Sequence, residues 1–529
     1  MNLRPNGAAD GEDLPGPPAM NGPGDIIPAA TRSFASKTAL ITDTASFTYA
    51  ELDELTARGA QGLRDRGIRP GQIVSLYGPN SWQWVVAYHA ALRAGAVVNP
   101  INTMLTEEEV AFILKDCHAA ALLTRADRLP AMRAMAAELP DVSLLLGLDS
   151  GADDGFEALL ANGKSVEQKP VDPLTLSTIG YTSGTTGHPK GAMQSQQAVL
   201  LNCQLTAMMH GRNSGDTMVT ALPAPHVYGN VAINSTFLSG GTVVLMERFS
   251  PGAALDLVEK HQATLFEGVP AMYSMMLAHD RLASTDLTSL TRSTVGGQTI
   301  ALSTIERWQG ASGAPLIELW GMTELSGLGT THALGAAPCP GSIGVALPGT
   351  EVRVGDLNDS SRTAPAGTPG ELLVRGPLVM LGYHGQDQAT AETVDKDGWL
   401  HTGDIAYSDE SGHFFIVDRR KDMIITAGYN VYPAEIERVL AAHPDVAMVA
   451  VGPVPDEVKG ETARAYVVPT AEATATAEQL IEYCRTRLAP YKVPRSVQFS
   501  ASLPQTSTGK IMRRRLAETN TDHPSQGEN

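Results

Sequence analysis

The chain contains few cysteines for its length, only four in 529 residues: Cys117, Cys203, Cys339 and Cys484. They are far apart and form no C-x-x-C pair. A zinc site is therefore not expected, and a disulfide framework does not suit so long a chain. Reduced, buried thiols in a cytosolic enzyme fit this usage, so we expect a cytoplasmic protein.

Basic residues are also scarce relative to acidic ones. Lys and Arg total 39 against 57 Asp and Glu, which gives a formal net charge of −18. A nucleic-acid-binding protein needs a basic face, and an anionic membrane surface attracts basic segments. The composition therefore argues against both partners, although a local basic pocket around a nucleotide is compatible with it.

No apolar run is suited to cross a membrane. The most apolar stretch, residues 82–101, is interrupted by His89 and Arg93 and fits a buried helix followed by a strand. The opening MNLRPNGAADGEDLPGPPAM lacks the apolar core of a signal peptide. Its Pro, Gly and Asn content predicts a disordered lead-in over residues 1–30, and residues 518–529 are expected to form a disordered tail.

Strand-like and helix-like runs alternate from about residue 36 onward. KTALITD and IVSLYG are typical of buried strands. Residues 48–67 have helical spacing that ends at Gly67, and Thr106 can cap a second helix whose first turn is acidic. This alternation predicts an α/β protein with largely parallel sheets covered by helices.

The pattern changes near residue 340, where short strands such as GELLVRG and HFFIVD alternate with turn residues. After about residue 420 it becomes a compact mixed α/β segment, with Pro433 at a helix start. A chain of this length needs more than one core. We therefore predict a large N-terminal body of stacked α/β sheets plus a small β-rich subdomain, residues 31–420. A small mobile mixed α/β C-terminal domain follows, residues 421–517.

The segment YTSGTTGHPKGAM, residues 181–193, is a candidate phosphate loop. It is not a Walker loop, because Lys190 follows Pro189 and precedes Gly191. Its glycines let backbone N–H groups point at an anion, its hydroxyls add donors, and Lys190 adds a positive charge. An ordinary Gly/Thr surface turn explains the segment equally well when it is taken alone.

A second candidate is ELWGMTEL, residues 318–325. Trp320 offers a face for a purine, Thr323 a phosphate donor and Glu324 an oxygen ligand for Mg²⁺. The structural alternative is a helix start with a buried tryptophan.

Two further candidates follow in the C-terminal third. Asp404, placed on a tight turn, could accept hydrogen bonds from two ribose hydroxyls, and Arg419, beyond a predicted hairpin, could reach the same sugar or a phosphate. Lys510 lies in the polar segment PQTSTGKIMRR. Each of these residues alone is equally well explained as solvated surface.

Together these segments resemble the motifs of the AMP-forming acyl-CoA synthetases, in the adenylate-forming superfamily that includes firefly luciferase and the adenylation domains of nonribosomal peptide synthetases. The match runs from about residue 30 to 517, with several long motifs in the expected order. The resemblance implies that ATP activates a carboxylic acid as acyl-AMP, with release of pyrophosphate. Coenzyme A then accepts the acyl group, and Mg²⁺ is the implied metal.

The resemblance also implies residue roles. The TSGTTG loop closes over the β- and γ-phosphates, Lys510 bridges the carboxylate and the α-phosphate, and Lys421 is the hinge of the C-terminal domain. The implied catalytic residues are Lys510, Glu324, Thr323 and His226, and the implied metal ligands are Glu324 and Thr185. The implied ATP- and AMP-binding residues are Thr182, Ser183, Gly184, Thr185, Thr186, Gly187, Lys190, Gly296, Gly297, Gln298, Glu318, Leu319, Trp320, Gly321, Met322, Thr323, Asp404, Ile416, Arg419 and Lys510. The implied acyl pocket is His226, Tyr228, Gly229, Asn230, Gly297, Leu319 and Met322, and the implied coenzyme A tunnel is Gly428 and Tyr429.

The chain departs from the family pattern at three positions. Trp320 stands where tyrosine is more frequent, Leu319 where glycine is frequent, and Gln298 where a small residue is frequent. Leu319 and Gln298 would shorten the acyl pocket and add a polar contact, and Asn230 and Asn234 could add polarity. We therefore expect a short- or medium-chain, polar or aromatic acid.

Three alternatives remain. An enzyme that loads an acyl group onto a carrier protein is the nearest, but PAPHVYGN has no carboxylate to hold the α-ammonium of an amino acid. Nothing in the sequence selects a luciferase-like oxygenase. A non-enzymatic scaffold would have lost Glu324, Asp404, Arg419 or Lys510, and all four are present. A homodimer is expected by analogy alone.

Overall fold

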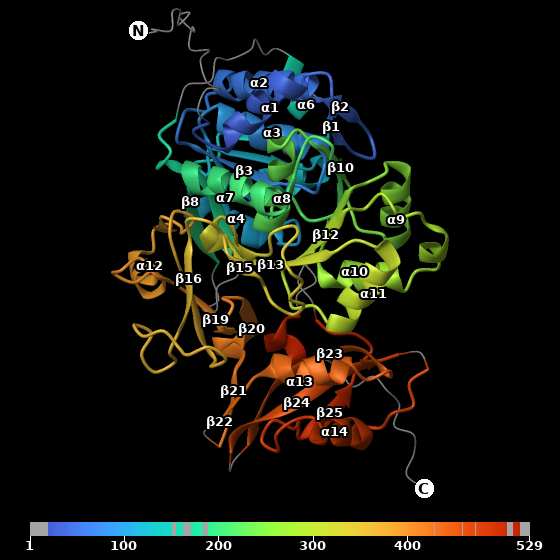
Figure 1. Cartoon of the computed structure of the whole chain (residues 1–529). Helices are drawn as coiled ribbons and strands as arrows, with labels where there is room; N and C mark the ends of the chain where they lie inside the picture. Colours follow the sequence, from blue (N-terminus) through green and yellow to red (C-terminus); the bar gives the residue numbers. More distant parts are fainter. Residues whose placement is uncertain are drawn as a thin grey trace, which may run out of the picture.

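The structure is a computed structural model that describes residues 20–150, 155–161, 171–182, 189–427, 429–456, 459–470, 472–504 and 511–518. Three sheets with their helices form the body, and a separate small sheet follows at the C-terminal end (Figure 1). The α/β fold class predicted from the alternating pattern is confirmed. Within the described residues, no helix is both long enough and apolar enough to cross a membrane.

The first large sheet has seven strands, parallel from β7 through β6 and antiparallel at β8 and β18. Both faces of β3 are buried: Val74 and Leu76 pack in one core, while Ile73 and Tyr77 pack in another. In sheet order the strands are β18 (Gly382–Tyr383), β8 (Lys190–Ser195), β7 (Leu176–Thr182), β4 (Val97–Pro100), β3 (Ile73–Tyr77), β5 (Ala121–Thr124) and β6 (Leu144–Gly147).

The second large sheet has nine strands and is parallel from β1 to β13. At its other end the sheet is antiparallel, because β14 pairs antiparallel with both β13 and β15. In sheet order the strands are β15 (Val345–Ala346), β14 (Gly327–Thr331), β13 (Leu316–Met322), β12 (Arg292–Val295), β11 (Leu265–Gly268), β9 (Thr217–Thr220), β10 (Thr242–Leu245), β1 (Thr38–Ile41) and β2 (Ser46–Thr48).

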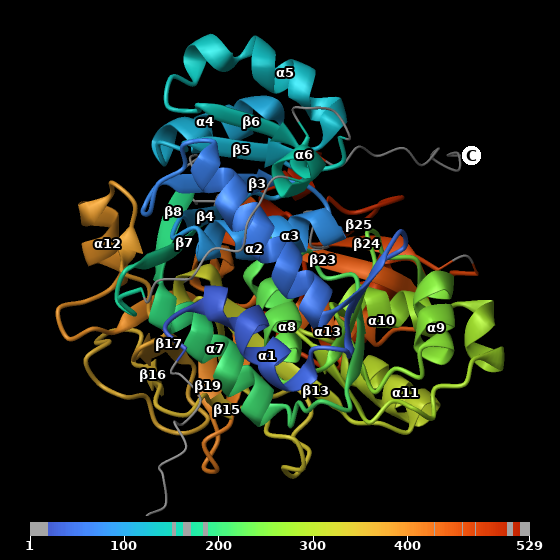
Figure 2. The same cartoon turned by 90° about the horizontal axis from the view of Figure 1, so that it is seen from above.

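Helices cover these sheets, and their starts follow local capping rules (Figure 2). Thr106 closes a capping box with Glu109 at the start of its helix, as expected, and Gly67 follows the end of α2 with φ +91°. The helices of the body are α1 (Ile26–Phe34), α2 (Tyr49–Asp65), α3 (Trp82–Arg93), α4 (Glu107–Asp116), α5 (Leu129–Ala134), α6 (Phe156–Ala161), α7 (Gln196–Met209), α8 (Val227–Leu238), α9 (Pro251–Lys260), α10 (Pro270–Leu277), α11 (Leu302–Ser312) and α12 (Asp387–Thr393).

The expected lead-in over residues 1–30 is partly wrong. Helix α1 begins at Ile26, and Ile26 and Ile27 are fully buried in the main core. Burying two isoleucines gains several kcal/mol, on the order of 1.5–3 for each. Order therefore begins earlier than the Pro- and Gly-rich sequence predicted. Residues 1–19 and 519–529 lie outside the described part of the chain.

A four-stranded antiparallel sheet forms the β-rich part of the body, as predicted. Its strands are β16 (Glu351–Gly355), β17 (Gly370–Arg375), β19 (Leu400–Ser408) and β20 (Phe414–Arg419). The expected tight turn at Asp404 is wrong, because Asp404 lies within β19, just after Gly403 with φ +70°. The β19–β20 hairpin places it directly opposite Arg419.

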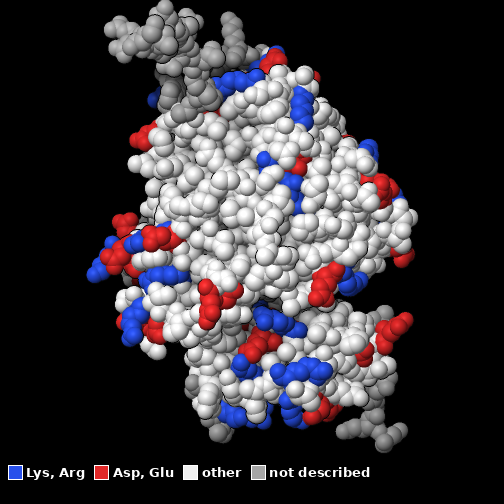
Figure 3. Space-filling model, viewed as in Figure 1, with Lys and Arg blue, Asp and Glu red and all other residues white. Residues whose placement is uncertain are grey.

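The C-terminal sheet has its own core, which contains Ile424, Val451 and Leu480. It contacts the body where Asp418 of β20 accepts a hydrogen bond from the backbone N–H of Ala434 and lies 3.5 Å from the guanidinium of Arg513. Figure 3 shows a narrowing at this junction, with charged side chains of both signs beside it. The elements are β21 (Ile424–Thr426), β22 (Tyr429–Val431), α13 (Pro433–Ala441), β23 (Val446–Asp456), β24 (Gly460–Pro469), α14 (Ala477–Arg485) and β25 (Ser496–Phe499).

Candidate active site

The candidate site forms where all three sheets of the body meet. The side-chain amide of Gln194, on β8, donates to the Thr323 carbonyl at 2.9 Å. The Met380 N–H donates to the Glu324 carbonyl at 2.8 Å. The indole N–H of Trp320, on β13, donates to an Asp404 carboxylate oxygen at 2.8 Å. Residues remote in sequence are thereby fixed around the end of β13.

Trp320, Asp404 and Arg419 form one connected group. Asp404 is 4% exposed and receives the indole N–H on Oδ2, while the Arg419 guanidinium lies 2.5 Å from Oδ1. Charge-assisted hydrogen bonds of this kind are the stronger ones in proteins. The Asp404 carboxylate is therefore held in one orientation, and half-exposed Arg419 remains accessible from solvent.

Glu324 lies next to this group and is nearly buried. The Tyr383 hydroxyl donates to its Oε1 at 2.8 Å, and the Lys190 ammonium lies over the Tyr383 ring, 5.1 Å from its centre. Burial raises the pKa of Glu324, and the Tyr383 hydrogen bond and the charge of Arg419 partly oppose this. A carboxylate whose charged form is disfavoured by burial gains from a cation placed beside it, so this residue fits a Mg²⁺ ligand.

Glu318, on β13, is hydrogen-bonded to the connection that follows β14 and not to the group around Trp320. Its Oε2 accepts the N–H of Gly341 at 2.7 Å, so the side chain is engaged by the connection that follows β14. Burial raises the pKa of Glu318 to about 7, and the Gly341 hydrogen bond opposes the shift. Glu318 thus anchors the strand that carries Trp320.

The start of α8 carries four of the predicted acyl-pocket residues. His226 is the N-cap and accepts the Tyr228 N–H on Nδ1 at 3.3 Å. A Cβ at Gly229 would lie 2.2 Å from the Pro223 carbonyl oxygen, so only glycine fits this close approach. Asn230 accepts hydrogen bonds on Oδ1 from the Tyr88 hydroxyl at 3.2 Å and from the Asn234 amide at 3.0 Å.

Leu319 and Met322 point to different cores. Leu319 packs with Tyr228 in the main core, and a Cβ at Gly296 would lie 2.2 Å from Leu319 Cδ1. Met322 packs with Trp320 in the core of the β-rich sheet. Met322 therefore packs beside Trp320, a predicted nucleotide residue, in a different core from Leu319.

A cavity of about 90 Å³ opens between β7, β8 and the start of α8. His226, Asn230 and Thr323 line it, together with polar residues that the sequence motifs did not indicate, notably Tyr88 and Thr178. Thr323, expected beside the phosphates, thus also faces a space next to His226.

The remaining predicted residues are placed as follows. Thr182 ends β7, and its hydroxyl lies 3.4 Å from the Lys190 carbonyl. Gly297 and Gln298 follow β12, and Gly321 is the penultimate residue of β13. Ile416 lies in β20, and Lys421 lies in a 3₁₀ turn directly after β20. Tyr429 begins β22, 58% exposed, with its ring stacked 4.9 Å from that of Tyr491. Ser183, Gly184, Thr185, Thr186, Gly187, Gly428 and Lys510 lie outside the described residues.

Comparison with known proteins identifies the family. The AMP-binding enzyme profile matches residues 28–384, and the profile of the AMP-binding enzyme C-terminal domain matches residues 435–510. The chain is a member of the AMP-binding enzyme family.

Relatives of this AMP-binding enzyme act as acid–thiol ligases. It is 38% identical to the feruloyl-CoA synthase of an Amycolatopsis species, over 88% of this chain and 93% of that protein. It is 32% identical to a long-chain-fatty-acid–CoA ligase of Bacillus subtilis, over 94% of each chain. The crystal structure of ATP-bound MatB from Rhodopseudomonas palustris superposes with a TM-score of 0.88 at 31% identity, covering 94% of this chain and 99% of that one. The AMP-binding enzyme is therefore an AMP-forming acid–thiol ligase that uses ATP to form an acyl-AMP and then transfers the acyl group to coenzyme A.

Two parts of the AMP-binding enzyme's site gave no sequence signal. Tyr383 reaches Glu324 only because β18 pairs with β8, and Gln194 reaches Thr323 only because β8 packs against the 3₁₀ turn that follows β13. No spacing between these residues would have revealed either contact.

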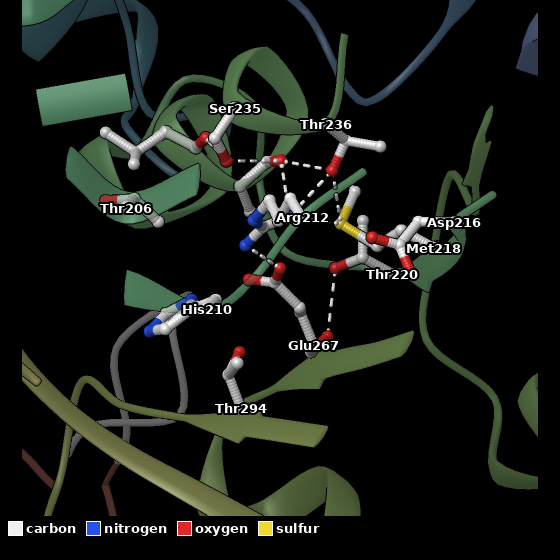
Figure 4. Close-up of polar contacts among 12 residues, drawn as sticks. Thr206, His210, Arg212, Asp216, Met218, Thr220, Ser235, Thr236, Glu267 and Thr294 are labelled. Carbon is white, nitrogen blue, oxygen red and sulfur yellow. Dashed lines mark hydrogen bonds and ion pairs between the residues drawn. The ribbon is translucent and has the colours of Figure 1, made fainter. Parts of the chain in front are cut away.

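A buried polar network around Arg212 and Glu267 contacts α8 (Figure 4). Arg212 pairs with Glu267, both side chains being 1% exposed, and also donates to the Thr236 hydroxyl and the Ala232 carbonyl of α8 at 2.7 and 3.2 Å. Such a pair adds little net stability but is costly to break from one side. It fixes the helix that presents Tyr228, whose hydroxyl lies 2.8 Å from that of Thr294.

Proposed function

We propose that the group around Trp320, Asp404 and Arg419 binds the adenosine of ATP, with the indole facing the base and the carboxylate accepting ribose hydroxyls. The joint orientation of Asp404 by Trp320 and Arg419 carries this proposal. A preoriented acceptor loses less conformational entropy when the ligand arrives. Lys190, at the start of β8, supplies positive charge on the phosphate side, together with the predicted loop Thr182–Gly187.

We propose Glu324 and Thr185 as the residues that hold Mg²⁺. When bound, the ion offsets negative charge on the triphosphate. The acid's carboxylate oxygen attacks the α-phosphorus, the bond to the bridging oxygen breaks, and pyrophosphate leaves. Lys510, whose ammonium is expected at the carboxylate and the α-phosphate, stabilises the charge that grows there.

In the second step the coenzyme A thiol gives its proton to solvent and its sulfur bonds to the acyl carbon. The bond from that carbon to the phosphate oxygen breaks, and AMP leaves with both electrons of that bond. We propose that the C-terminal domain, residues 421–517, turns about Lys421 between the two steps. This movement would remove Lys510 and bring Gly428 and Tyr429 to the thiol path. The exposed Tyr429–Tyr491 ring pair offers an apolar surface for that second arrangement. His226 would lie beside the acyl carbon.

We propose an acid no longer than medium-chain, polar or aromatic. Leu319 supports this choice because its side chain occupies the space against Gly296. The polar rim formed by Asn230 and Tyr88 favours an acid that carries a hydrogen-bonding group or an aromatic ring. The feruloyl relative acts on an acid of this kind, while the long-chain relative does not.

A turnover panel tests the acid class. Pyrophosphate release is measured for acetate, longer straight-chain acids up to palmitate, and the aromatic acids ferulate and indoleacetate, each with and without coenzyme A. We expect the highest kcat/KM for an aromatic or medium-chain acid. A clear preference for palmitate over every shorter acid would refute the proposal.

We also propose a cytoplasmic, homodimeric enzyme that uses coenzyme A rather than a carrier protein. Light scattering on the purified chain tests the dimer. Thioester formation with free coenzyme A, in the absence of any protein acceptor, tests the choice of thiol.

A further inference from the structure

A second set of potential metal ligands lies outside the nucleotide site. The ligand atoms of Cys339, Asp409 and His413 all lie within 4.8 Å of one another, and the three residues are half-buried. Cys339 belongs to the connection between β14 and β15, and Asp409 and His413 flank the turn of the β19–β20 hairpin. The wide separation of these residues in the sequence explains why cysteine spacing predicted no zinc site.

The surrounding backbone fixes these ligands before any ion binds. Asp409 Oδ1 accepts the N–H of Ser411 at 2.9 Å and of His413 at 2.8 Å, which orients the carboxylate toward the imidazole. The Ile343 N–H donates to the Phe414 carbonyl, and the Phe414 N–H donates to the Gly344 carbonyl, at 2.9 and 3.0 Å. These bonds hold the two segments side by side next to the cluster, so little further ordering is needed.

The ligand types select the class of ion. A thiolate, an imidazole and a carboxylate suit Zn²⁺, whereas Mg²⁺ and Ca²⁺ prefer oxygen ligands alone. Tetrahedral zinc with bonds of about 2.0–2.3 Å places its ligand atoms roughly 3.3–3.8 Å apart. Asp409 Oδ2 and His413 Nδ1 are already 3.3 Å apart, and since every pair of ligand atoms lies within 4.8 Å, no pair has to close by more than about 1.5 Å.

The three half-buried ligand residues are reachable from solvent, and His332 lies beside one of them, His413. The His332 ring lies beside the His413 ring in a tilted arrangement with centroids 5.7 Å apart, and its Nε2 lies 2.9 Å from the Ser342 carbonyl. Cys339 and His332 also line a cavity of about 70 Å³ with Glu318, which provides a route for an ion. Three protein ligands leave a fourth position for water.

We propose that Cys339, Asp409 and His413 form a Zn²⁺-binding site. A bound ion would tie the β14–β15 connection, whose Gly341 anchors Glu318, to the hairpin that carries Asp404 and Arg419. The ion would thereby brace the two segments on either side of Trp320. This inference does not depend on the proposed acid or on the roles proposed for catalytic residues.

Zn²⁺ titration of the full-length chain without a histidine tag tests the site, using a chromophoric chelator as competitor and no ATP. We expect one equivalent of Zn²⁺. The variants Cys339→Ser, Asp409→Asn and His413→Gln should each weaken its affinity by more than the roughly tenfold loss that follows removal of an outer-shell partner. His118→Gln is the matched control, because His118 pairs with Asp141 at 2.9 Å outside this cluster, and the neighbouring Cys117 thiol is buried against Leu114 and Asn99 instead.

Thiol alkylation provides an independent readout. Cys117, Cys203 and Cys484 are buried, so Cys339 should react first with iodoacetamide. Zn²⁺ should slow this reaction in the wild type, and Mg²⁺ should leave it unchanged. The proposal is overturned if Zn²⁺ binds equally well to all three variants, binds the wild type no better than Cys339→Ser does, or leaves Cys339 alkylation unchanged.

Discussion

Replacing Trp320 with phenylalanine isolates one contact of the nucleotide site. The phenyl ring keeps an aromatic face for adenine but removes the indole N–H that Asp404 accepts at 2.8 Å. A hydrogen bond to a charged group contributes about 1.5–3 kcal/mol. Arg419 still holds the other carboxylate oxygen at 2.5 Å, so we expect the lower end of that range. This corresponds to roughly tenfold weaker ATP binding.

The assay is the dissociation constant for ATP, measured by equilibrium titration without acid, together with the KM for ATP in pyrophosphate release. Trp399→Phe is the matched control, because its ring contacts Arg353 and Arg375 at the surface of the β-rich sheet instead of the site. Thermal unfolding of both variants separates lost binding from lost stability. Unchanged ATP affinity in Trp320→Phe would refute the reasoning.

Three further predictions concern the residues around this group. The pKa of Glu318 is raised to about 7 in the folded chain, so the unfolded chain loses this proton at lower pH and the free energy of unfolding falls as pH rises from about 4.5 to 7. Glu318→Gln should remove up to about 3 kcal/mol of that pH dependence. Urea unfolding that gives the same pH dependence for the wild type and the variant would contradict the assignment. Gly229→Ala should destabilise the chain by about 1–3 kcal/mol, because its Cβ would meet the Pro223 carbonyl oxygen. The control Gly310→Ala in α11, where a Cβ meets nothing within 4 Å, should be neutral or stabilising. Equal melting temperatures of the two variants would show that the close approach at Gly229 does not matter. Leu319→Ala should shift the preferred acid toward longer chains, and an unchanged acid panel in a folded variant would remove Leu319 from the acyl pocket.

Local signals in the sequence were sufficient for much of the fold. Thr106 begins α4 with a capping box, and Gly67 follows α2 in a left-handed conformation, both as expected. Alternation of short apolar runs with amphipathic segments predicted the α/β class. The helix at Ile26 was missed because the Pro- and Gly-rich residues before it hid a short apolar segment whose order comes from burial in the main core.

The site was predicted as a set of motifs, and its contacts depended on tertiary pairing. The position of Asp404 opposite Arg419 follows from the β19–β20 register, in a strand whose Gly403 suggested a turn. Tyr383 reaches the site from β18, which carries no motif, and Gln194 lies on β8 just beyond the last residue of the phosphate-loop segment. The sequence predicted that Leu319 shortens the acyl pocket, but it did not indicate that the Leu319 side chain packs against Gly296.

Single-turnover kinetics of a Lys510→Ala variant tests the central claim most directly. Lys492→Ala, which removes a lysine paired with Glu435 at 2.7 Å, is the control. The account predicts that formation of acyl-AMP slows by about 10²–10³-fold in Lys510→Ala, the loss typical for removal of one transition-state charge contact. Conversion of supplied acyl-AMP and coenzyme A to thioester should stay close to the wild-type rate. Acyl-AMP formation by Lys510→Ala at the wild-type rate would contradict the account.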